Sequence, residues 1–234
     1  TRTEVAINEQ VSPNRLYITQ GFIGSDDNNF TTTLGREGSD YTAAIFAYCL
    51  NGSSVTIWKD VPGVLNADPR HFESTRLLHH ISYQEAIELA FYGASVIHPK
   101  TLQPLQRKEI PLHVKSFINP DDKGTKVSKG VAIDPHVPCF IVKNDLALIR
   151  LSSLDFSFII EKNISDIFAM LHKHKMKVDL IQNSAISFSV CVFDKFNKME
   201  ELIHELSGRF QVDYTADVSL YTIRHFQAGS ADFL

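Results

Sequence analysis

The sequence predicts a mixed α/β fold in two parts, and the order of its strand and helix patterns indicates both. Between residues 55 and 116, short apolar strand patterns alternate with helical patterns, which is typical of an α/β sheet. Between residues 147 and 215, the patterns follow in the order β-α-β-β-α-β, which is the ferredoxin-like arrangement. The polar stretch "NPDDKGTKVSK" at residues 119–129 separates the two and predicts a boundary between about residues 126 and 145.

The composition excludes several classes of protein. The chain is 44% hydrophobic and 21% charged, as in soluble globular proteins, and no apolar run is long enough to span a membrane. A net charge of -4 with scattered Lys and Arg argues against nucleic-acid binding. Cys49, Cys139 and Cys191 lie among apolar neighbours without a C-x-x-C pair, which predicts packed thiols in a reducing cytoplasm. The ten histidines are dispersed, so no metal site is expected.

In the first part, two strands are expected before the first long helix. Residues 16–23, "LYITQGFI", are rich in β-branched and aromatic residues and predict a strand, and residues 31–34 predict a short strand that pairs back. From Ser39 the apolar residues recur at helical spacing, which predicts a helix. Ser39 or Gly38 is the expected N-cap, and the Asn-Gly dipeptide at residues 51–52 ends the helix.

The alternating elements follow. Residues 55–58 predict a short buried strand that leads into the loop "KDVPGVLNADPR". Ser82 opens a second helix with Glu85 at the capping-box position, and Pro99 is tolerated in the first turn of a third helix. The stretch "IPLHVKSF" predicts the strand that closes this part.

The second part contains the β-α-β-β-α-β pattern, and its residues define each element. The expected elements are a strand at 147–151, a helix at 164–174, strands at 177–182 and 187–192, a helix at 199–206 and a strand at 210–215. A further alternating stretch at 218–224 predicts a strand that begins another unit.

The stretch "TTTLGREGSDYTAA" predicts an anion-binding site at the start of the first long helix. A helix N-terminus exposes unpaired N–H groups, and glycines allow a ligand to approach the backbone closely. Arg36 adds a bidentate donor for a carboxylate or phosphate, Ser39 adds a hydroxyl donor, and Asp40 can hold an ammonium group. The alternative is a capped helix with Arg36 paired on the surface to Glu37 or Asp40.

The stretch "WKDVPGVLNADPR" predicts a second binding region, because open α/β sheets bind ligands beyond the ends of their strands. Lys59 and Arg70 could face phosphates, and Asp60 could bind the sugar or base of a nucleotide. The alternative is an ordinary loop whose prolines fix its path. Neither stretch matches the P-loop or the dinucleotide-binding glycine motif.

The ordered combination of these stretches with "ISYQEAIELAFYGASVIHPK" and Gly124-Thr125 resembles aspartate kinase (aspartokinase) from Gln20 to about Ser128. The resemblance implies a fold in which the C-terminal part of an amino-acid kinase (carbamate-kinase-like) domain precedes an ACT regulatory domain of the ferredoxin-like βαββαβ type. The implied boundaries are 1–128 for the kinase part, 129–144 for a linker, 145–217 for the ACT domain and 218–234 for the start of a second ACT unit. The family's N-terminal Lys-Phe-Gly-Gly-Thr-Ser motif is not in the sequence, so we expect a fragment that is inactive alone.

The resemblance also implies roles for individual residues. Catalysis is expected to involve Arg36 and Asp40, and the substrate-binding residues would be Arg36, Gly38, Ser39 and Asp40. ATP would be bound by Lys59, Asp60 and Arg70, with Mg²⁺ bridging the phosphates and few protein ligands to the metal. An amino-acid effector, lysine or threonine, would contact Asp179 and Ser184 in "KVDLIQNSAISFSV".

The implied reaction transfers the γ-phosphoryl group of ATP to the side-chain carboxylate of L-aspartate and forms 4-phospho-L-aspartate. This is the first step of lysine, threonine and methionine biosynthesis, and the resemblance implies a cytoplasmic homodimer under feedback control. The alternative is a regulatory amino-acid-binding subunit without catalysis of its own. A related amino-acid kinase such as glutamate 5-kinase fits less well, because such enzymes do not have this ACT arrangement.

Three positions depart from the family pattern. Glu37 replaces a glycine that is common in bacterial members, and Ser95 replaces a lysine in "FYGASVIHP". Ala185 follows Ser184 where lysine-sensitive relatives often have a glutamate, so a bound lysine would lose one charged partner.

Overall fold

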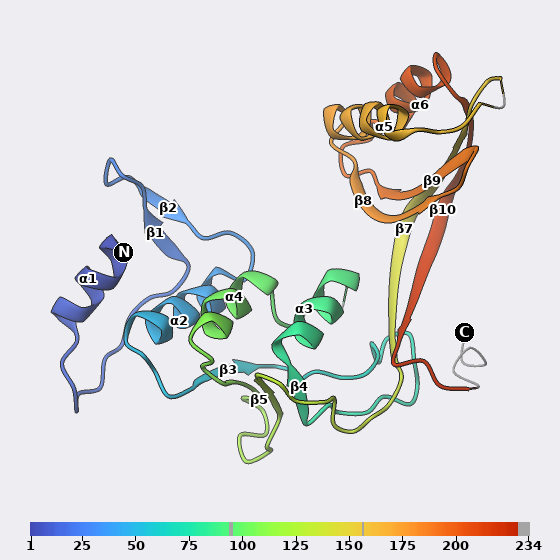
Figure 1. The fold of residues 1–234 in the computed structure, drawn as a ribbon. Helices are drawn as coiled ribbons and strands as arrows, with labels where there is room; N and C mark the ends of the chain where they lie inside the picture. The colour runs from blue at the N-terminus through green and yellow to red at the C-terminus, as the bar shows by residue number, and fades with distance from the viewer. Residues whose placement is uncertain (94–95, 156, 229–234) are drawn as a thin grey trace. The chain divides into compact units, whose positions relative to one another are not determined.

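The structure is a computed structural model that describes residues 1–93, 96–155 and 157–228 (Figure 1). The chain divides into two compact units, which are considered separately. The first contains residues up to Ile141 together with those from Thr222 onward, and the second is Val142–Tyr221. The prediction of a mixed α/β fold is confirmed, because helices and strands alternate along the chain. None of the described helices is both long enough and apolar enough to span a membrane.

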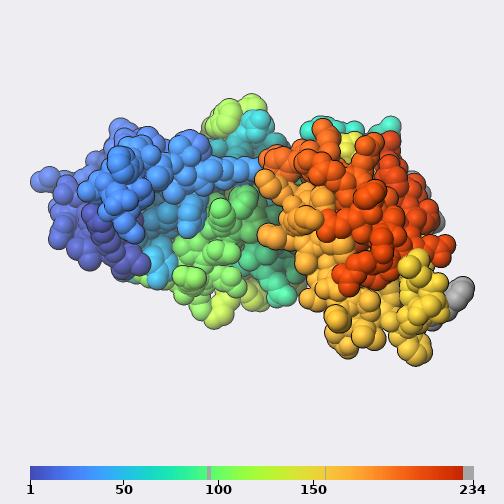
Figure 2. All heavy atoms as spheres, turned by 90° about the horizontal axis from the view of Figure 1, so that it is seen from above, coloured from blue at the N-terminus to red at the C-terminus, as the bar shows by residue number. Residues whose placement is uncertain are grey.

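The N-terminal segment differs from the prediction. A helix, α1 (Arg2–Gln10), begins at a capping box formed by Thr1 and Glu4, and the strand expected at residues 16–23 is not formed. Only β1 (Ile23–Ser25) is extended, and it pairs antiparallel with β2 (Thr31–Thr33). Leu16 and Ile18 are 92% and 95% exposed, because the described residues provide no neighbouring strand to pair with this apolar stretch. Residues 1–33 lie at one end of the first unit (Figures 1 and 2).

The first long helix, α2 (Gly38–Cys49), is confirmed, but its N-cap is Glu37 and not Ser39 or Gly38. Glu37 has the left-handed conformation (φ 56°, ψ 32°), and no side chain caps the helix. Gly38 begins the helix in a tight space, since a Cβ there would lie 2.7 Å from the Phe22 ring and 3.0 Å from the Leu34 Cβ. The first helical position therefore has no room for a side chain.

A four-stranded sheet forms the centre of the first unit. Its strands are β3 (Val55–Lys59), β4 (His80–Ser82), β5 (Leu112–Ser116) and β6 (Thr125–Ser128), in the order β3-β5-β6-β4. The β3–β5 and β4–β6 pairs are parallel, and β5 and β6 are antiparallel. Figure 1 shows α2, α3 (Tyr83–Tyr92) and α4 (Pro99–Arg107) on one side of this sheet. Their apolar faces bury one core with the strands, which includes Leu78, Leu102 and Leu112 at 0% exposure.

Helix α3 begins where the sequence predicts, but the Glu85 side chain has a different partner from the one expected. The Ser82 hydroxyl accepts a hydrogen bond from the Glu85 N–H (3.0 Å), as expected for a helix start. The Glu85 carboxylate does not complete a capping box, and instead accepts two hydrogen bonds from the Arg224 guanidinium (2.9 Å each). Burial alone would raise the pKa of Glu85, but the bonds from Arg224 and His225 outweigh it and hold that pKa below its ordinary value.

The second unit has the element order that the sequence predicts. Its elements are most of β7 (Cys139–Ser152), α5 (Glu161–Lys173), β8 (Lys177–Asn183), β9 (Ser187–Phe193), α6 (Met199–Ser207) and most of β10 (Gln211–Arg224), with the sheet order β10-β7-β9-β8. The two helices pack on a core of strand residues that includes Ile149, Val192 and Phe188. Figure 1 shows α5 and α6 together on one side of these strands.

Two strands are longer than predicted. β7 begins at Cys139, inside the stretch expected as a linker, and β10 is continuous where two strands were expected at 210–215 and 218–224. The separate strand at 218–224 is therefore wrong. Polar residues interrupt the apolar alternation in both strands, but neighbouring pairing keeps them extended, as in the bond from Ser219 to Asn144 (2.8 Å). The assignment of 218–234 to a second ACT unit stays a prediction, and residues 229–234 lie outside the described part.

The prediction that the three cysteines are packed in the interior is confirmed. Cys49, Cys139 and Cys191 are free and buried. Burial, with a contribution from Glu85, raises the pKa of Cys139 to about 12, so this thiol stays protonated at neutral pH.

Gly124 and Gly130 provide a matched test of close packing near β5. Both have positive φ (+66° and +69°), but a Cβ at Gly124 would lie 2.0 Å from the Val114 carbonyl oxygen, whereas nothing lies within 4 Å of one at Gly130. Gly130→Ala should cost about 1–2 kcal/mol of stability for the left-handed backbone alone. Gly124→Ala should cost roughly a further 1–3 kcal/mol, because β5 must move. Urea unfolding measures both, and equal losses would contradict this account.

Candidate functional site

The fold brings together two stretches that the sequence assigns to different ligands. Asp40 lies in the first turn of α2, and Lys59 is the last residue of β3. The Lys59 Nζ donates to the Asp40 Oδ2 over 2.6 Å, and the two side chains are only 22% and 12% exposed. A charged pair that is this well shielded interacts more strongly than an exposed pair. The predicted substrate and nucleotide stretches therefore meet at one ion pair.

The helix start beside Asp40 can accept an anion. The N–H groups of the first turn have no partner within the helix, and no side chain caps them. The Gly38 N–H is used by the Gly35 carbonyl (3.1 Å), which forms the turn before the helix. The helix dipole favours negative charge at this end. The uncapped helix start is the local geometry on which the predicted anion site with Arg36 and Ser39 relies, and the assignment of these residues stays a prediction.

Arg36 lies mainly in solvent. Its side chain is 73% exposed, and the nearest carboxylate contact runs from its Nε to the Glu37 Oε1 at 3.8 Å, which is too long for a hydrogen bond. This is the arrangement of the alternative interpretation, in which Arg36 is a surface residue beside Glu37. The other carboxylate oxygen of Glu37 is buried without a hydrogen-bond partner, so Glu37 does not hold the guanidinium firmly. The role of Arg36 in binding stays a prediction.

The other two predicted nucleotide residues, Asp60 and Arg70, lie in the loop after β3. Asp60 is exposed directly beyond the strand. Arg70 is 83% exposed and is fixed by Asp68, with its Nε 3.0 Å from Oδ1 and its Nη2 2.6 Å from Oδ2. This hydrogen bonding holds the pKa of Asp68 below its ordinary value. Asp68 was not among the predicted site residues, but the Asp-Pro-Arg spacing could have indicated that its carboxylate orients the arginine.

The loop after β3 is tied to the sheet. The Thr125 hydroxyl accepts a hydrogen bond from the Val64 N–H (2.8 Å) and donates one to the Leu78 carbonyl (2.6 Å). Lys59 is opposite Ser116 in the parallel β3–β5 pair, so both strands end at the same edge of the sheet. This edge is where α/β proteins bind ligands. Residues 94 and 95 lie outside the described part, and the departure at Ser95 is therefore not placed.

The predicted effector residues lie in the second unit, on β8 and the turn after it. The Asp179 side chain is 2% exposed and accepts a hydrogen bond from the Lys143 Nζ at 2.5 Å. The β8–β9 register shifts between Val178 and Leu180, so Asp179 occupies the irregular position that directs its side chain inward. Lys143 was not identified from the sequence. Ser184 is exposed, and its N–H bonds the Ser187 carbonyl (2.8 Å).

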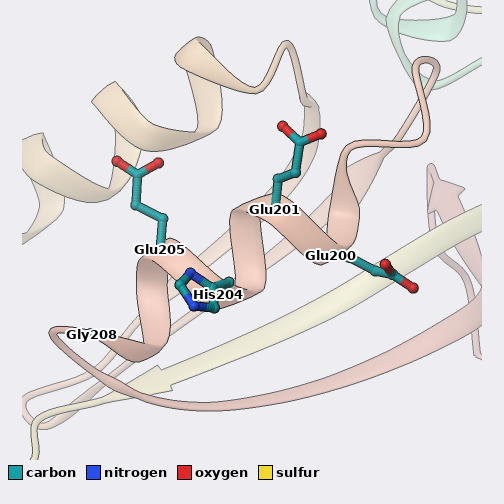
Figure 3. A pocket seen from close by; sticks show the side chains of 5 residues that line it. All are labelled: Glu200, Glu201, His204, Glu205 and Gly208. Carbon is teal, nitrogen blue, oxygen red and sulfur yellow. The ribbon is translucent and has the colours of Figure 1, made fainter.

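A shallow open pocket lies along α6 and contains none of the predicted site residues (Figure 3). Its lining is Glu200, Glu201, His204, Glu205 and Gly208. Glu205 accepts hydrogen bonds from Lys173 and His174 (2.7 Å each), and these bonds hold the pKa of Glu205 below its ordinary value. Its charge is thus compensated by the protein. Within the described ranges, no group of three or more His, Cys, Asp or Glu side chains is placed to hold a metal ion.

The chain is similar to known sequences of amino-acid kinases. Residues 2–116 match the family model described as the amino acid kinase family. The chain is 41% identical over 175 residues to lysine-sensitive aspartokinase 3 of Escherichia coli. The aligned region covers 75% of this chain and 39% of the relative. It is 31% identical to the aspartokinase of Schizosaccharomyces pombe, over 82% of this chain and 42% of the relative. The chain therefore spans well under half of the length of these relatives.

Solved structures agree with these matches. The E. coli aspartokinase III complex with lysine and aspartate (T-state) has a TM-score of 0.73 at 36% identity and covers 87% of this chain and 46% of that chain. The complex of the same enzyme with aspartate and ADP (R-state) has a TM-score of 0.69 at 34% identity, with coverages of 87% and 47%. Clostridium acetobutylicum aspartate kinase has a TM-score of 0.78 at 24% identity and supports the fold alone. The chain is thus similar to aspartokinases in sequence and, over the aligned residues, in fold.

A double-mutant cycle tests whether Asp40 and Lys59 interact in solution. Asp40→Asn, Lys59→Met and the double variant should give a coupling of about 0.5–3 kcal/mol in the free energy of unfolding, because each single change leaves a shielded charge unpaired. The same cycle on Asp68 and Arg70 is the control and should give a smaller coupling, since Arg70 is 83% exposed. Chemical unfolding measures both, and no coupling between Asp40 and Lys59 would show that the pair is not formed.

Proposed function

We propose that this chain is part of an aspartate kinase, which transfers the γ-phosphoryl group of ATP to the side-chain carboxylate of L-aspartate. The product is 4-phospho-L-aspartate, the first intermediate of lysine, threonine and methionine biosynthesis. The observation that carries the proposal is the 2.6 Å contact of Lys59 with Asp40, which joins the predicted nucleotide and substrate stretches. The similarity to a structure that binds aspartate and ADP supports it.

In this proposal, the start of α2 binds the amino acid. Arg36 pairs with a substrate carboxylate, and Gly38 and Ser39 allow it to approach the first-turn N–H groups and the Ser39 hydroxyl. Asp40 binds the substrate ammonium group. The carboxylate that attacks ATP is already ionised at neutral pH, so the reaction needs no strong base. Catalysis then depends on positioning and on neutralising charge on the transferred group.

The edge of the sheet beyond β3 binds the nucleotide in this proposal. Lys59 and Arg70 neutralise phosphate oxygens, and Asp68 orients Arg70 for this task. Asp60, exposed at the strand end, fits either a nucleotide hydroxyl or the water shell of a Mg²⁺ ion. That donor set suits a metal that is held mainly by phosphate oxygens and water. When bound, Mg²⁺ would supply further neutralisation of the phosphate charge.

We further propose that the second unit is an ACT domain that binds an amino-acid effector, lysine or threonine, near Asp179 and Ser184. Its β-α-β-β-α-β order and the similarity to an aspartokinase structure with bound lysine support this assignment. Asp179 already bonds the Lys143 ammonium, which is the group that a lysine effector would also present. A cytoplasmic homodimer, as the resemblance implies, belongs to the same proposal.

Two arginine substitutions separate the proposed ligand sites. In the protein that contains this chain, Arg36→Ala should raise the KM for aspartate roughly 10- to 150-fold, the effect of losing one charge-assisted hydrogen bond. The KM for ATP should change little. Arg70→Ala should show the opposite pattern. Coupled measurement of ADP release over both substrates gives these constants, and an Arg36→Ala enzyme with an unchanged aspartate KM would remove Arg36 from the site.

The effector proposal has its own binding test. Asp179→Asn should weaken lysine binding about tenfold or more, because a buried carboxylate loses its charge. Asp213→Asn is the matched control, since Asp213 is 70% exposed on β10 and pairs with Arg150 at 3.3 Å. Calorimetry with lysine, threonine and methionine measures the binding, and circular dichroism confirms that each variant is folded. Effector binding without any aspartate or nucleotide binding would instead favour a purely regulatory module.

A further inference from the structure

We infer that the Lys59 ammonium is an exchangeable occupant of Asp40, which the ammonium group of the amino-acid substrate displaces so that Lys59 can turn to the nucleotide phosphates. The inference rests on the proposed function and extends it, because it makes substrate binding a condition for nucleotide binding. It starts from the observation that a protein cation already occupies the carboxylate to which we assign the substrate ammonium.

The occupant and the substrate group have the same chemistry. The Lys59 Nζ carries three donors and a positive charge, as does the α-ammonium of an amino acid. It lies 2.6 Å from the Asp40 Oδ2 in a setting where both side chains are largely shielded from water. Two ammonium groups on one shielded carboxylate would repel each other strongly at such distances. Binding of the substrate therefore favours the departure of the Lys59 ammonium.

The backbone of Lys59 is held in place, whereas its side chain can move. Its carbonyl oxygen accepts a hydrogen bond from the Phe117 N–H (2.9 Å), and the residue is paired in register with Ser116 of β5. The flexible four-carbon side chain therefore pivots from a fixed strand end. That strand end opens onto the edge of the sheet and the exposed Asp60, where the nucleotide is proposed to bind.

The exchange has two consequences. Without an amino acid, Lys59 stays on Asp40, so the nucleotide region has one cation fewer and binds phosphates more weakly. With an amino acid, the released cation strengthens nucleotide binding, and linkage requires that the nucleotide strengthens amino-acid binding by the same factor. A dicarboxylic acid without an ammonium group, such as succinate, cannot drive the exchange.

The test measures how strongly the two ligands are coupled. Calorimetry on the longest form of the protein that carries this chain gives the Kd of a non-hydrolysable ATP analogue with Mg²⁺, alone and with saturating aspartate or succinate. We expect aspartate, but not succinate, to lower this Kd about fivefold or more, which is the lower range of coupling between linked sites. In Lys59→Met, the Kd should no longer depend on aspartate, and aspartate itself should bind more tightly because its competitor is gone.

Lys115→Met is the matched control. Lys115 lies on the neighbouring strand β5, where its Nζ bonds the Pro120 carbonyl (2.8 Å), so this variant should keep the coupling of the original protein. Equal effects of aspartate and succinate on the original protein, or full coupling in Lys59→Met, would overturn the exchange. If Lys59 has a purely structural role, Lys59→Met should weaken the binding of both ligands and leave their coupling intact. That result would also overturn the exchange. If the original protein binds neither aspartate nor nucleotide, the proposed function fails instead.

Discussion

The ion pair between Asp40 and Lys59 is the interaction on which the candidate site depends. It joins the first turn of α2 to the end of β3, and the two residues are 19 positions apart in the sequence. The start of the helix packs closely against Phe22 and Leu34 at Gly38, and the strand end is held by the register of β3 with β5. Two rigid elements thus present opposite charges to each other in a shielded place. A pair of this kind can exchange partners without rearranging the backbone, since only side chains need to move.

The second unit uses the same physical device in a different setting. Asp179 is more deeply buried than Asp40, and Lys143 neutralises it across the sheet. Burying a carboxylate without a partner is costly, so removal of the neighbouring cation would destabilise the fold. The Arg70–Asp68 pair is different, because it lies in solvent and breaking it costs little. Burial therefore separates the pairs that can control access to a carboxylate from the pair that only orients a side chain.

The elements predicted correctly from the sequence are those in which the local residue pattern and the packing in the fold favour the same structure. The helical spacing after Ser39, the start of α3 at Ser82 and the β-α-β-β-α-β order all appear in the structure. The strand expected at residues 16–23 does not, because a strand needs a neighbour and local apolar alternation cannot supply one. The partners of Asp40 and Asp179 were also missed. Only the fold brings Lys59 next to Asp40 and Lys143 next to Asp179. Composition and spacing identify charged residues, but not the charges that they meet.

The two ends of the proposed substrate site would then contribute unequally to selectivity. Arg36 is largely solvated and has no firm partner to give up, so it can pair with a carboxylate of either an amino acid or a simple dicarboxylate. Asp40 must exchange one shielded cation for another. Only a ligand with a well-placed ammonium group can replace the interaction that Asp40 loses with Lys59. Selection between an amino acid and a simple dicarboxylate therefore falls on Asp40. On this argument, the exposed guanidinium captures the ligand, and the shielded carboxylate identifies it.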